Sequence, residues 1–290
     1  MAKRVGLFLV TNLFVVLTLS VALNLLGVNR YAGTGQMAIF CLVWGMGGAF
    51  ISLQMSRFIA KRSTGMRLVD GQSGNADADW LYGTVEALTR KAGLPMPEIG
   101  IYESGEVNAF ATGPSRSKSL VAVSTGLLRS MGRQEVEGVL AHEVAHIANG
   151  DMVTMTLLQG VVNAFVMFLA RVVAFAISNS GSRDGERRGN GGGSVLVMMV
   201  LQIVFGILGS MVTAWFSRQR EFRADAGGAT LAGRDNMISA LRRLMTTHEL
   251  VDTQQSALAT LKISGARGWM VFLSTHPPLE QRIAALEAGR

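Results

Sequence analysis

Four long apolar runs constrain this chain more than any other feature of its sequence. They cover residues 5–27, 34–55, 153–176 and 194–216, and Arg171 is the only charged residue in them. A helix needs ~20 predominantly apolar residues to cross the ~30 Å hydrocarbon core of a bilayer. Because such runs are rare in soluble folds, they predict four transmembrane helices rather than four buried helices of a soluble core.

The composition supports a membrane protein and excludes several other classes. Of the 290 residues, 49% are hydrophobic and 16% are charged, against about 25% charged in typical soluble domains. So little charge excludes intrinsic disorder. Cys41 is the only cysteine, which excludes a disulfide framework and any site built from several thiolates. Because Cys41 lies within the second run, we expect it to serve packing.

The positions of the basic residues predict the topology. They gather before the first run and after the second and fourth, as Lys3, Arg4, Arg57, Lys61, Arg62, Arg67, Arg218, Arg220 and Arg223. The loop after the first run carries only Arg30, although the loop 178–193 holds three arginines and weakens the contrast. By the positive-inside rule both termini are expected in the cytoplasm. The first run is too long for a signal peptide, so we expect an uncleaved span.

The net charge of +7 raises the question of a nucleic-acid partner. Most of the basic residues flank the apolar runs, where they are expected to contact anionic lipid. The sequence contains no nucleic-acid-binding motif, so we expect a lipid bilayer as partner and no nucleic acid. Arg171, near the far end of its run, is expected to extend its side chain to the headgroups.

The remaining sequence predicts one cytoplasmic domain in two parts. We expect two spans within 1–56, the first part of the domain in 57–151, two spans within 152–217, and the second part in 218–290. Residues 63–79 are typical of a linker. The periodicity predicts helices over 80–92, 133–149, 238–250 and 279–286, and strands over 99–102, 107–112 and 119–123. A further helix is expected from residue 217, loosened at Gly227-Gly228.

The predicted helix 133–149 carries the sequence His142-Glu143-Val144-Ala145-His146, an H-E-x-x-H motif. Residues four apart lie one turn apart on the same helix face, so both imidazoles can bind one zinc ion. Glu143 can then act as the general base toward the water that attacks the scissile peptide bond. We therefore predict one Zn²⁺ per chain, bound in part by His142 and His146.

A catalytic zinc ion needs a third protein ligand, and four residues compete for this role: Glu221, Asp225, Asp151 and His276. A continued helix would turn Asp151 about 140° away from the histidine face. Glu221 and Asp225 share one face of their predicted helix, and geometry alone does not separate them. The longer side chain favours Glu221 as the ligand, with Asp225 orienting a ligand histidine. Two spans separate His146 from Glu221, so both return to the same side of the membrane.

These motifs resemble those of the HtpX-type membrane zinc metalloproteases, which share a family with the CAAX prenyl endopeptidase. The resemblance covers nearly the whole chain and includes Glu221-Phe222-Arg223-Ala224-Asp225, Val107 to Gly113 and Ser274-Thr275-His276-Pro277-Pro278. It implies a mainly α integral membrane protein: four transmembrane helices plus a cytoplasmic α+β zincin-like metalloprotease domain with a small β-sheet. It also implies a bacterial inner-membrane endopeptidase that cleaves misfolded membrane proteins in stress response and quality control.

Carried over residue by residue, the resemblance implies that His142, His146 and Glu221 bind zinc and that Glu143 is the base. It places His276 near the metal, where it can stabilise the tetrahedral oxyanion. The extended segment Asn108-Ala109-Phe110-Ala111 can offer an exposed edge to which a peptide substrate adds as a strand.

Two alternatives remain open at this point. A four-span transporter or scaffold would use the zinc helix without catalysis, but the spans contain no acidic or histidine residues, which ion pathways usually require. Processing of prenylated peptides would keep the chemistry and change the substrate.

Overall fold

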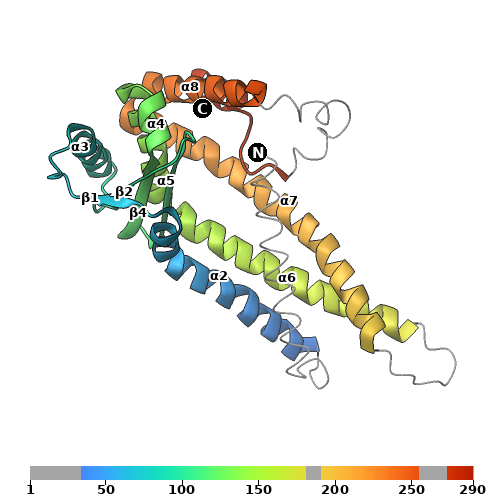
Figure 1. Ribbon diagram of the computed structural model, residues 1–290. Helices are drawn as coiled ribbons and strands as arrows, with labels where there is room; N and C mark the ends of the chain where they lie inside the picture. Colours follow the sequence, from blue (N-terminus) through green and yellow to red (C-terminus); the bar gives the residue numbers. More distant parts are fainter. Residues whose placement is uncertain (1–33, 181–190, 255–272, 290) are drawn as a thin grey trace. The chain divides into compact units, whose positions relative to one another are not determined.

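The structure is a computed structural model that describes residues 34–180, 191–254 and 273–289 (Figure 1). The predicted first span, residues 5–27, lies outside these ranges. The chain divides into two compact units. The helical unit contains the described residues up to Ile51, those of Met155–Phe216, and residues 273–275; the mixed unit contains those of Ser52–Thr154, Ser217–Val271 and His276–Arg290.

Three long helices pass through the helical unit: α2 (Thr34–Thr64), α6 (Asp151–Ser180) and α7 (Gly191–Ala232). Each contains a stretch long and apolar enough to cross a membrane, with mean hydropathy of 1.7, 2.1 and 2.5. These helices match the second, third and fourth apolar runs. Phe50, Phe165 and Phe175 lie on them with about 60% of their surface exposed (59%, 61% and 64%), as a lipid-facing surface requires.

Small residues bring these helices together within the helical unit. A Cβ atom added to Gly45 of α2 would lie 2.7 Å from the backbone nitrogen of Ala164 in α6, and one added to Gly209 of α7 would lie 2.6 Å from Val162. Larger side chains at these glycines would force the helices apart, so the packing follows the small-residue rule for membrane helices.

The side chain of Arg171 does not lie where the sequence predicts. Its side chain is buried (5% exposed), and its Nη1 donates a hydrogen bond to the carbonyl oxygen of Met167, 2.9 Å away and one turn earlier in α6. Side chains on a helix lean toward its N-terminus, so the guanidinium turns back along the helix. The expectation that Arg171 extends its side chain to the headgroups is therefore wrong, because the side chain is buried within the protein.

The mixed unit contains a four-stranded sheet formed by β1 (Arg67–Val69), β2 (Glu98–Tyr102), β3 (Ala109–Ser115) and β4 (Lys118–Ser124). The strand order is β1-β2-β4-β3; β2 pairs with β4 in parallel, and the outer pairs are antiparallel. β2, β3 and β4 lie where the sequence predicted strands. β1 lies inside the predicted linker, because three residues are too few to show an alternating pattern.

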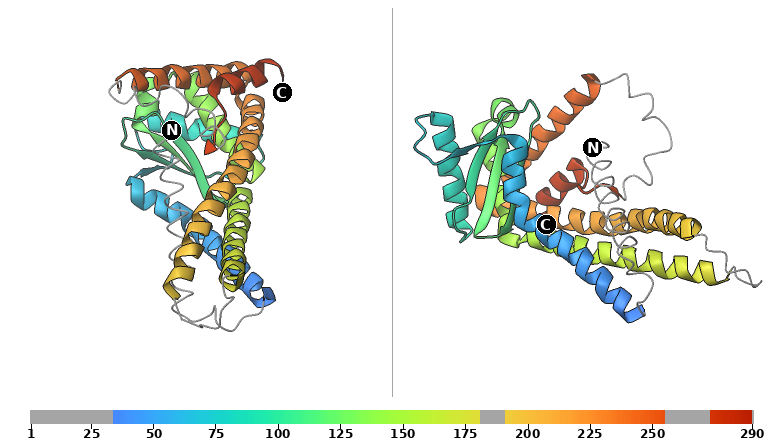
Figure 2. Two further views of the ribbon diagram at one scale, coloured as in Figure 1. Left: turned by 90° about the vertical axis from the view of Figure 1, so that its right-hand side faces the viewer. Right: turned by 60° about the horizontal axis from the view of Figure 1, so that its bottom comes forward.

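Two helices cover one face of this sheet (Figure 2). They are α3 (Ala76–Lys91), which begins at the N-cap Asn75, and α5 (Arg133–Asn149). Their apolar stripes meet the alternate side chains of the central strands in one core of Leu81, Val85, Leu88, Ile99, Val121, Val123, Val136, Val139, Leu140, Val144 and Ile147. The core therefore fixes one face of α5 against the sheet.

The remaining helices of the mixed unit are α4 (Thr125–Ser130), α8 (Arg234–Gln254) and α10 (Leu279–Glu287). α8 packs on α5, and α10 packs on α8. The end of α7 belongs to this unit and continues without a break through Gly227 and Gly228. The prediction that these glycines loosen the helix is wrong, since they serve packing instead. A Cβ atom on Gly227 would lie 2.8 Å from that of Ala145 in α5.

Candidate metal centre

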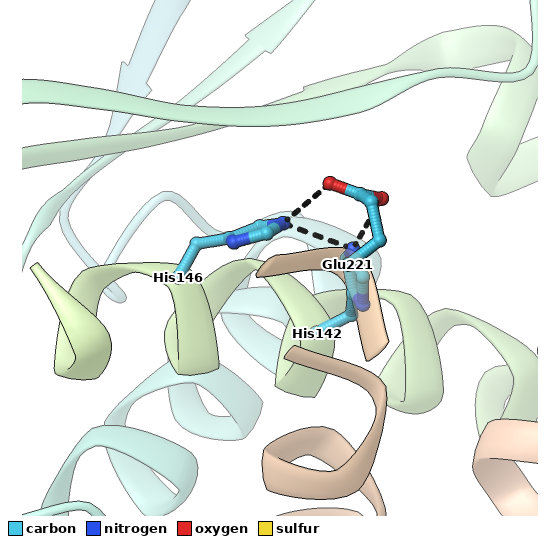
Figure 3. Close-up of side chains that lie close together, drawn as sticks. All are labelled: His142, His146 and Glu221. Carbon is cyan, nitrogen blue, oxygen red and sulfur yellow. Dashed lines mark hydrogen bonds and ion pairs between the residues drawn. The ribbon is translucent and has the colours of Figure 1, made fainter. Parts of the chain in front are cut away.

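Helix α5 presents His142 and His146 on one face, as the motif predicted (Figure 3). Both residues are buried, with 8% of their surface exposed. Their Nε2 atoms lie 3.1 Å apart, and the rings meet edge to face. The apolar stripe of α5 lies in the core, so the packing of that stripe fixes the direction in which the histidines point.

Helix α7 supplies the third member, Glu221, which is 1% exposed. Its Oε2 lies 3.6 Å from Nε2 of His142, and its Oε1 lies 3.4 Å from Nε2 of His146. The three side chains each offer a donor atom within 4.8 Å of the others. Gly227 and Gly228 let α7 approach α5 closely enough for this, since a Cβ atom on Gly228 would lie 3.1 Å from the backbone nitrogen of His142.

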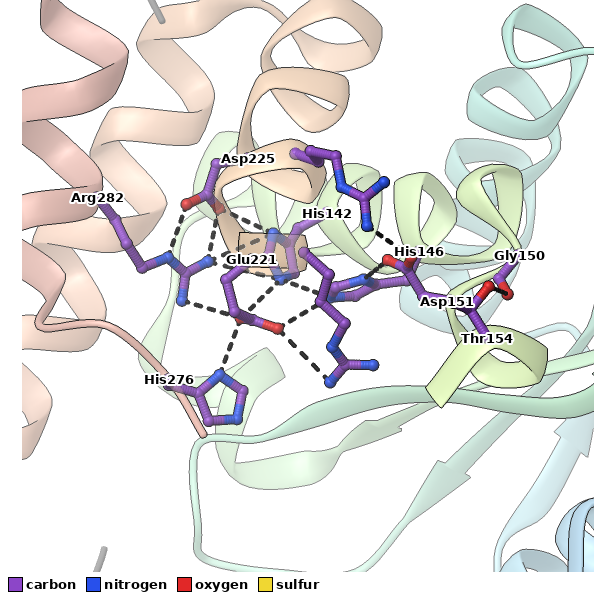
Figure 4. A network of polar contacts seen from close by, with 11 residues as sticks. His142, His146, Gly150, Asp151, Thr154, Glu221, Asp225, His276 and Arg282 are labelled. Carbon is purple, nitrogen blue, oxygen red and sulfur yellow. Dashed lines mark hydrogen bonds and ion pairs between the residues drawn. The ribbon is translucent and has the colours of Figure 1, made fainter. Parts of the chain in front are cut away.

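Two aspartates hold the far side of the imidazole rings (Figure 4). Oδ1 of Asp225 lies 2.9 Å from Nδ1 of His142, and Oδ2 of Asp151 lies 2.6 Å from Nδ1 of His146. A carboxylate accepts hydrogen bonds, so each Nδ1 carries the proton. In the neutral rings both Nε2 atoms then present a lone pair, which is the form that binds a metal ion.

This donor set fits a divalent cation. Two nitrogen lone pairs and a carboxylate converge in a buried space, where like partial charges repel strongly. Oε1 of Glu221 is buried and makes no hydrogen bond to the described part of the chain. Buried polar atoms are nearly always paired, and two imidazoles with one carboxylate are a common ligand set of catalytic zinc. The residues therefore fit the ion that the sequence predicted.

Arg282 of α10 is a further member of the site that the sequence analysis missed. Its Nε donates to Oδ2 of Asp225 at 2.7 Å and its Nη2 to Oδ1 at 2.5 Å, while its Nη1 lies 3.5 Å from Oε2 of Glu221. It is buried (6% exposed). A lone arginine in a short amphipathic helix carries no sequence signal, because only the tertiary fold brings it to the carboxylates.

The buried charges shift one another's pKa. Desolvation lowers the pKa of His146, but the carboxylates of Asp151 and Glu221 outweigh it and raise that pKa to about 9. The pKa of His142 is also raised, because Asp225 and Glu221 outweigh desolvation. Desolvation raises the pKa of Glu221, yet the neighbouring rings of His142, His146 and His276 hold that pKa far below its usual range. Glu221 is therefore ionised and available as a ligand.

The two residues predicted to take part in catalysis lie at this site. Glu143 is half-buried, and its carboxylate contributes to the raised pKa of both His146 and Arg282. Nδ1 of His276 lies 2.8 Å from Oε2 of Glu221, and about half of its side chain is exposed (51%). His276 thus contacts a candidate ligand directly, just before α10.

The segment predicted to bind substrate forms the edge of the sheet. Asn108 precedes β3; its carbonyl oxygen accepts a hydrogen bond from the backbone N–H of Ser124, so its backbone faces β4. Along an antiparallel strand the N–H and C=O groups of successive residues point alternately to one side and the other. Phe110, which pairs with Ala122, directs its backbone groups toward β4 as Asn108 does. The N–H and C=O groups of Ala109 and Ala111 therefore point to the outer side of β3. Their side chains pack on the core that contains α5.

Comparisons with known proteins show the family of this chain. The model of Peptidase family M48 matches residues 75–290. Protease HtpX of Aeromonas hydrophila subsp. hydrophila is 54% identical over 291 residues, which cover 98% of this chain and 99% of that protein. Protease HtpX of Idiomarina loihiensis is 51% identical over 294 residues, covering 99% of this chain and all of that protein (100%).

The fold is also similar to a solved structure. The crystal structure of S. mikatae Ste24p matches with a TM-score of 0.58 and 18% sequence identity, over 93% of this chain and 66% of that one. At this identity the likeness concerns the fold alone. The family model covers most of the chain, and the relatives are similar over nearly their whole length. The chain therefore belongs to peptidase family M48, a family of metallopeptidases, and to its membrane-associated HtpX proteases.

Proposed function

We propose that this chain is a zinc endopeptidase in which His142, His146 and Glu221 hold the ion. The observation that carries the proposal is the convergence of three buried donor atoms within 4.8 Å, with Nδ1 of both histidines already engaged by aspartates. A catalytic zinc site with three protein ligands keeps its fourth position for water or substrate. Membership of a peptidase family favours this function over a transporter or scaffold.

In the proposed mechanism Glu143 is the general base. A bound zinc ion would supply Lewis-acid polarisation of the scissile carbonyl and lower the pKa of water at the site. Glu143 removes the proton from that water and passes it to the nitrogen of the leaving amine. His276 donates from Nδ1 to Glu221, and its exposed ring is proposed to stabilise the developing oxyanion.

We propose that the substrate adds to β3 as an antiparallel strand. The outward N–H and C=O groups of Ala109 and Ala111 are an unpaired edge among the described strands, and such an edge binds an extended peptide through its backbone. Recognition of the backbone reads few side chains, which suits broad specificity and misfolded protein substrates. Asn108 takes a supporting role, because its amide nitrogen donates to the Tyr102 hydroxyl at 2.8 Å.

We also propose that the protein is a four-span protein of the bacterial inner membrane, with both termini and the catalytic residues in the cytoplasm. Three apolar helices support a membrane protein, and the basic residues that flank the runs support this orientation. Its substrates would be damaged membrane proteins.

Zinc content and casein cleavage of the detergent-purified protein test the proposal. The wild type should contain about one zinc ion per chain and cleave casein. Because Glu143 is a base and not a ligand, Glu143→Ala should keep the zinc and lose cleavage. Glu137→Ala, a change on the same helix that leaves the ligand set intact, should cleave as the wild type does. Cleavage by Glu143→Ala at the wild-type rate would show that the mechanism is wrong.

A further inference from the structure

Asp151 contacts a histidine of the site, but none of the catalytic roles above assigns a function to this residue. It is 2% exposed, and its Oδ2 lies 2.6 Å from Nδ1 of His146. It is the first residue of α6. A buried carboxylate on a ligand histidine fixes the orientation and tautomer of the ring in many metal sites.

The contact depends on a break between two helices. α5 ends at Asn149, and Gly150 takes the left-handed conformation (φ 71°, ψ 27°), with its N–H directed to the carbonyl oxygens of His146 and Ile147. A continued helix would have turned residue 151 about 140° from the histidine face. The turn at Gly150 instead brings the carboxylate of Asp151 back to the ring of His146.

The two histidines are supported unequally. Asp225, which faces His142, shares both of its oxygens with Arg282. Asp151 has a weaker competitor, since Nη2 of Arg223 lies 3.9 Å from Oδ1 and the arginine side chain is 66% exposed. Solvent screens such a pair. Asp151 therefore gives most of its interaction to His146, and its position as the first residue of α6 also suits a carboxylate.

We infer that Asp151 is the positioning residue of His146. It holds the proton on Nδ1 and fixes the plane of the ring, so that Nε2 presents its lone pair beside Nε2 of His142 and Oε1 of Glu221. The support of the site then comes from three helices: α6 through Asp151, α7 through Asp225, and α10 through Arg282. This inference rests on the proposed metal site.

Metal affinity of the full-length protein in detergent tests the inference. Zinc dissociation constants are measured by competition with a chelator, and the visible spectrum of the Co²⁺-loaded protein reports the ligand geometry. Asp151→Ala should weaken zinc binding by about 10–100-fold, as the loss of such a partner does, and change the Co²⁺ spectrum. Asp151→Asn keeps an acceptor for Nδ1–H without the charge, so its loss should be only about three- to tenfold. Its spectrum should stay close to that of the wild type.

Asp235→Ala is the matched control. Asp235 lies in the first turn of α8, so the change removes an acid from a helix start without touching a histidine, and zinc binding should equal that of the wild type. If Asp151→Ala binds zinc with wild-type affinity and shows the wild-type Co²⁺ spectrum, even with a lowered melting temperature, this inference is overturned and the proposed function is not. If Asp151→Ala does not fold, Asp151→Asn decides, and wild-type affinity there overturns the inference. A wild type that binds neither metal would overturn both this inference and the proposed function.

Discussion

His142 and His146 each face a carboxylate, and this pairing predicts how the proposed zinc binding depends on pH. The carboxylates of Asp151 and Glu221 raise the pKa of His146 to about 9 in the metal-free site, against the desolvation that lowers it. Below that pH the ring carries two protons, and a metal ion must displace the one on Nε2. Zinc affinity should therefore rise with pH, by about tenfold per unit from His146 alone.

This dependence can be measured by chelator competition between pH 6.5 and 8, together with the proton release recorded by calorimetry in buffers of different ionisation enthalpy. The raised pKa of His142 acts in the same direction. Glu221 stays ionised throughout this window because its pKa is lowered. A zinc affinity that is flat across this range would contradict the assigned protonation state of His146.

The ligand set makes a separate prediction at the residue scale. Glu221→Ala removes a buried donor atom and should abolish high-affinity zinc binding. Asp225→Ala leaves the three donors and should weaken binding by about 10–100-fold. His276→Ala should retain zinc and lower turnover, because its ring contacts Glu221 from an exposed position. Isothermal titration of each variant distinguishes them, and tight zinc binding by Glu221→Ala would remove this residue from the site.

The sequence predicted the residues of the site where a local pattern encodes them. The i, i+4 spacing of His142 and His146 was sufficient, because one helix determines their geometry. The sequence argues against Asp151 as a zinc ligand only if the helix is continuous, and the left-handed Gly150 ends α5 before that residue. Arg282 could not be predicted, since nothing near it in the sequence shows that α10 reaches the carboxylates.

At the scale of elements, the contact between α5 and α7 determines whether the ligands meet. Gly227→Ala should destabilise the fold and weaken zinc binding, because its Cβ atom would lie 2.8 Å from that of Ala145 and α7 would have to move with Glu221. Gly83 of α3 has open space around its Cβ position, so Gly83→Ala should stabilise by up to about 1 kcal/mol through helix propensity. Thermal unfolding measures the stability of the two variants, and zinc titration measures their metal affinity. If Gly227→Ala and Gly83→Ala had the same stability and the same zinc affinity, this account would be contradicted.

The elements themselves were predictable to different degrees. The bounds of α5 follow from its apolar stripe, and Val121 and Val123 reveal β4 by alternation. The start of α3 was predicted four residues late, because the N-cap Asn75 lies in a polar stretch typical of a linker. The sequence predicts that Gly227 and Gly228 loosen α7, but tertiary packing overrides the low helix propensity of glycine where α7 and α5 meet closely.

At the scale of the whole molecule, the topology remains a prediction. Reporters fused after Arg290 should report the cytoplasm, and reporters inserted between Gly181 and Gly193 should report the opposite side, because the basic residues are expected on the side of the termini. Reporter activity and protease protection in cells give the measurement. An external C-terminus would contradict both the proposed orientation and the proposed cytoplasmic cleavage.

Metal removal and return test the central claim most directly. Detergent-purified protein is stripped with a chelator, titrated with Zn²⁺ and assayed for casein cleavage at each step. The account predicts that activity is lost on stripping and returns in proportion to zinc, reaching its maximum at about one ion per chain, while Glu221→Ala shows no return. Full cleavage by the stripped protein, or restored cleavage in Glu221→Ala, would contradict a zinc endopeptidase built on His142, His146 and Glu221.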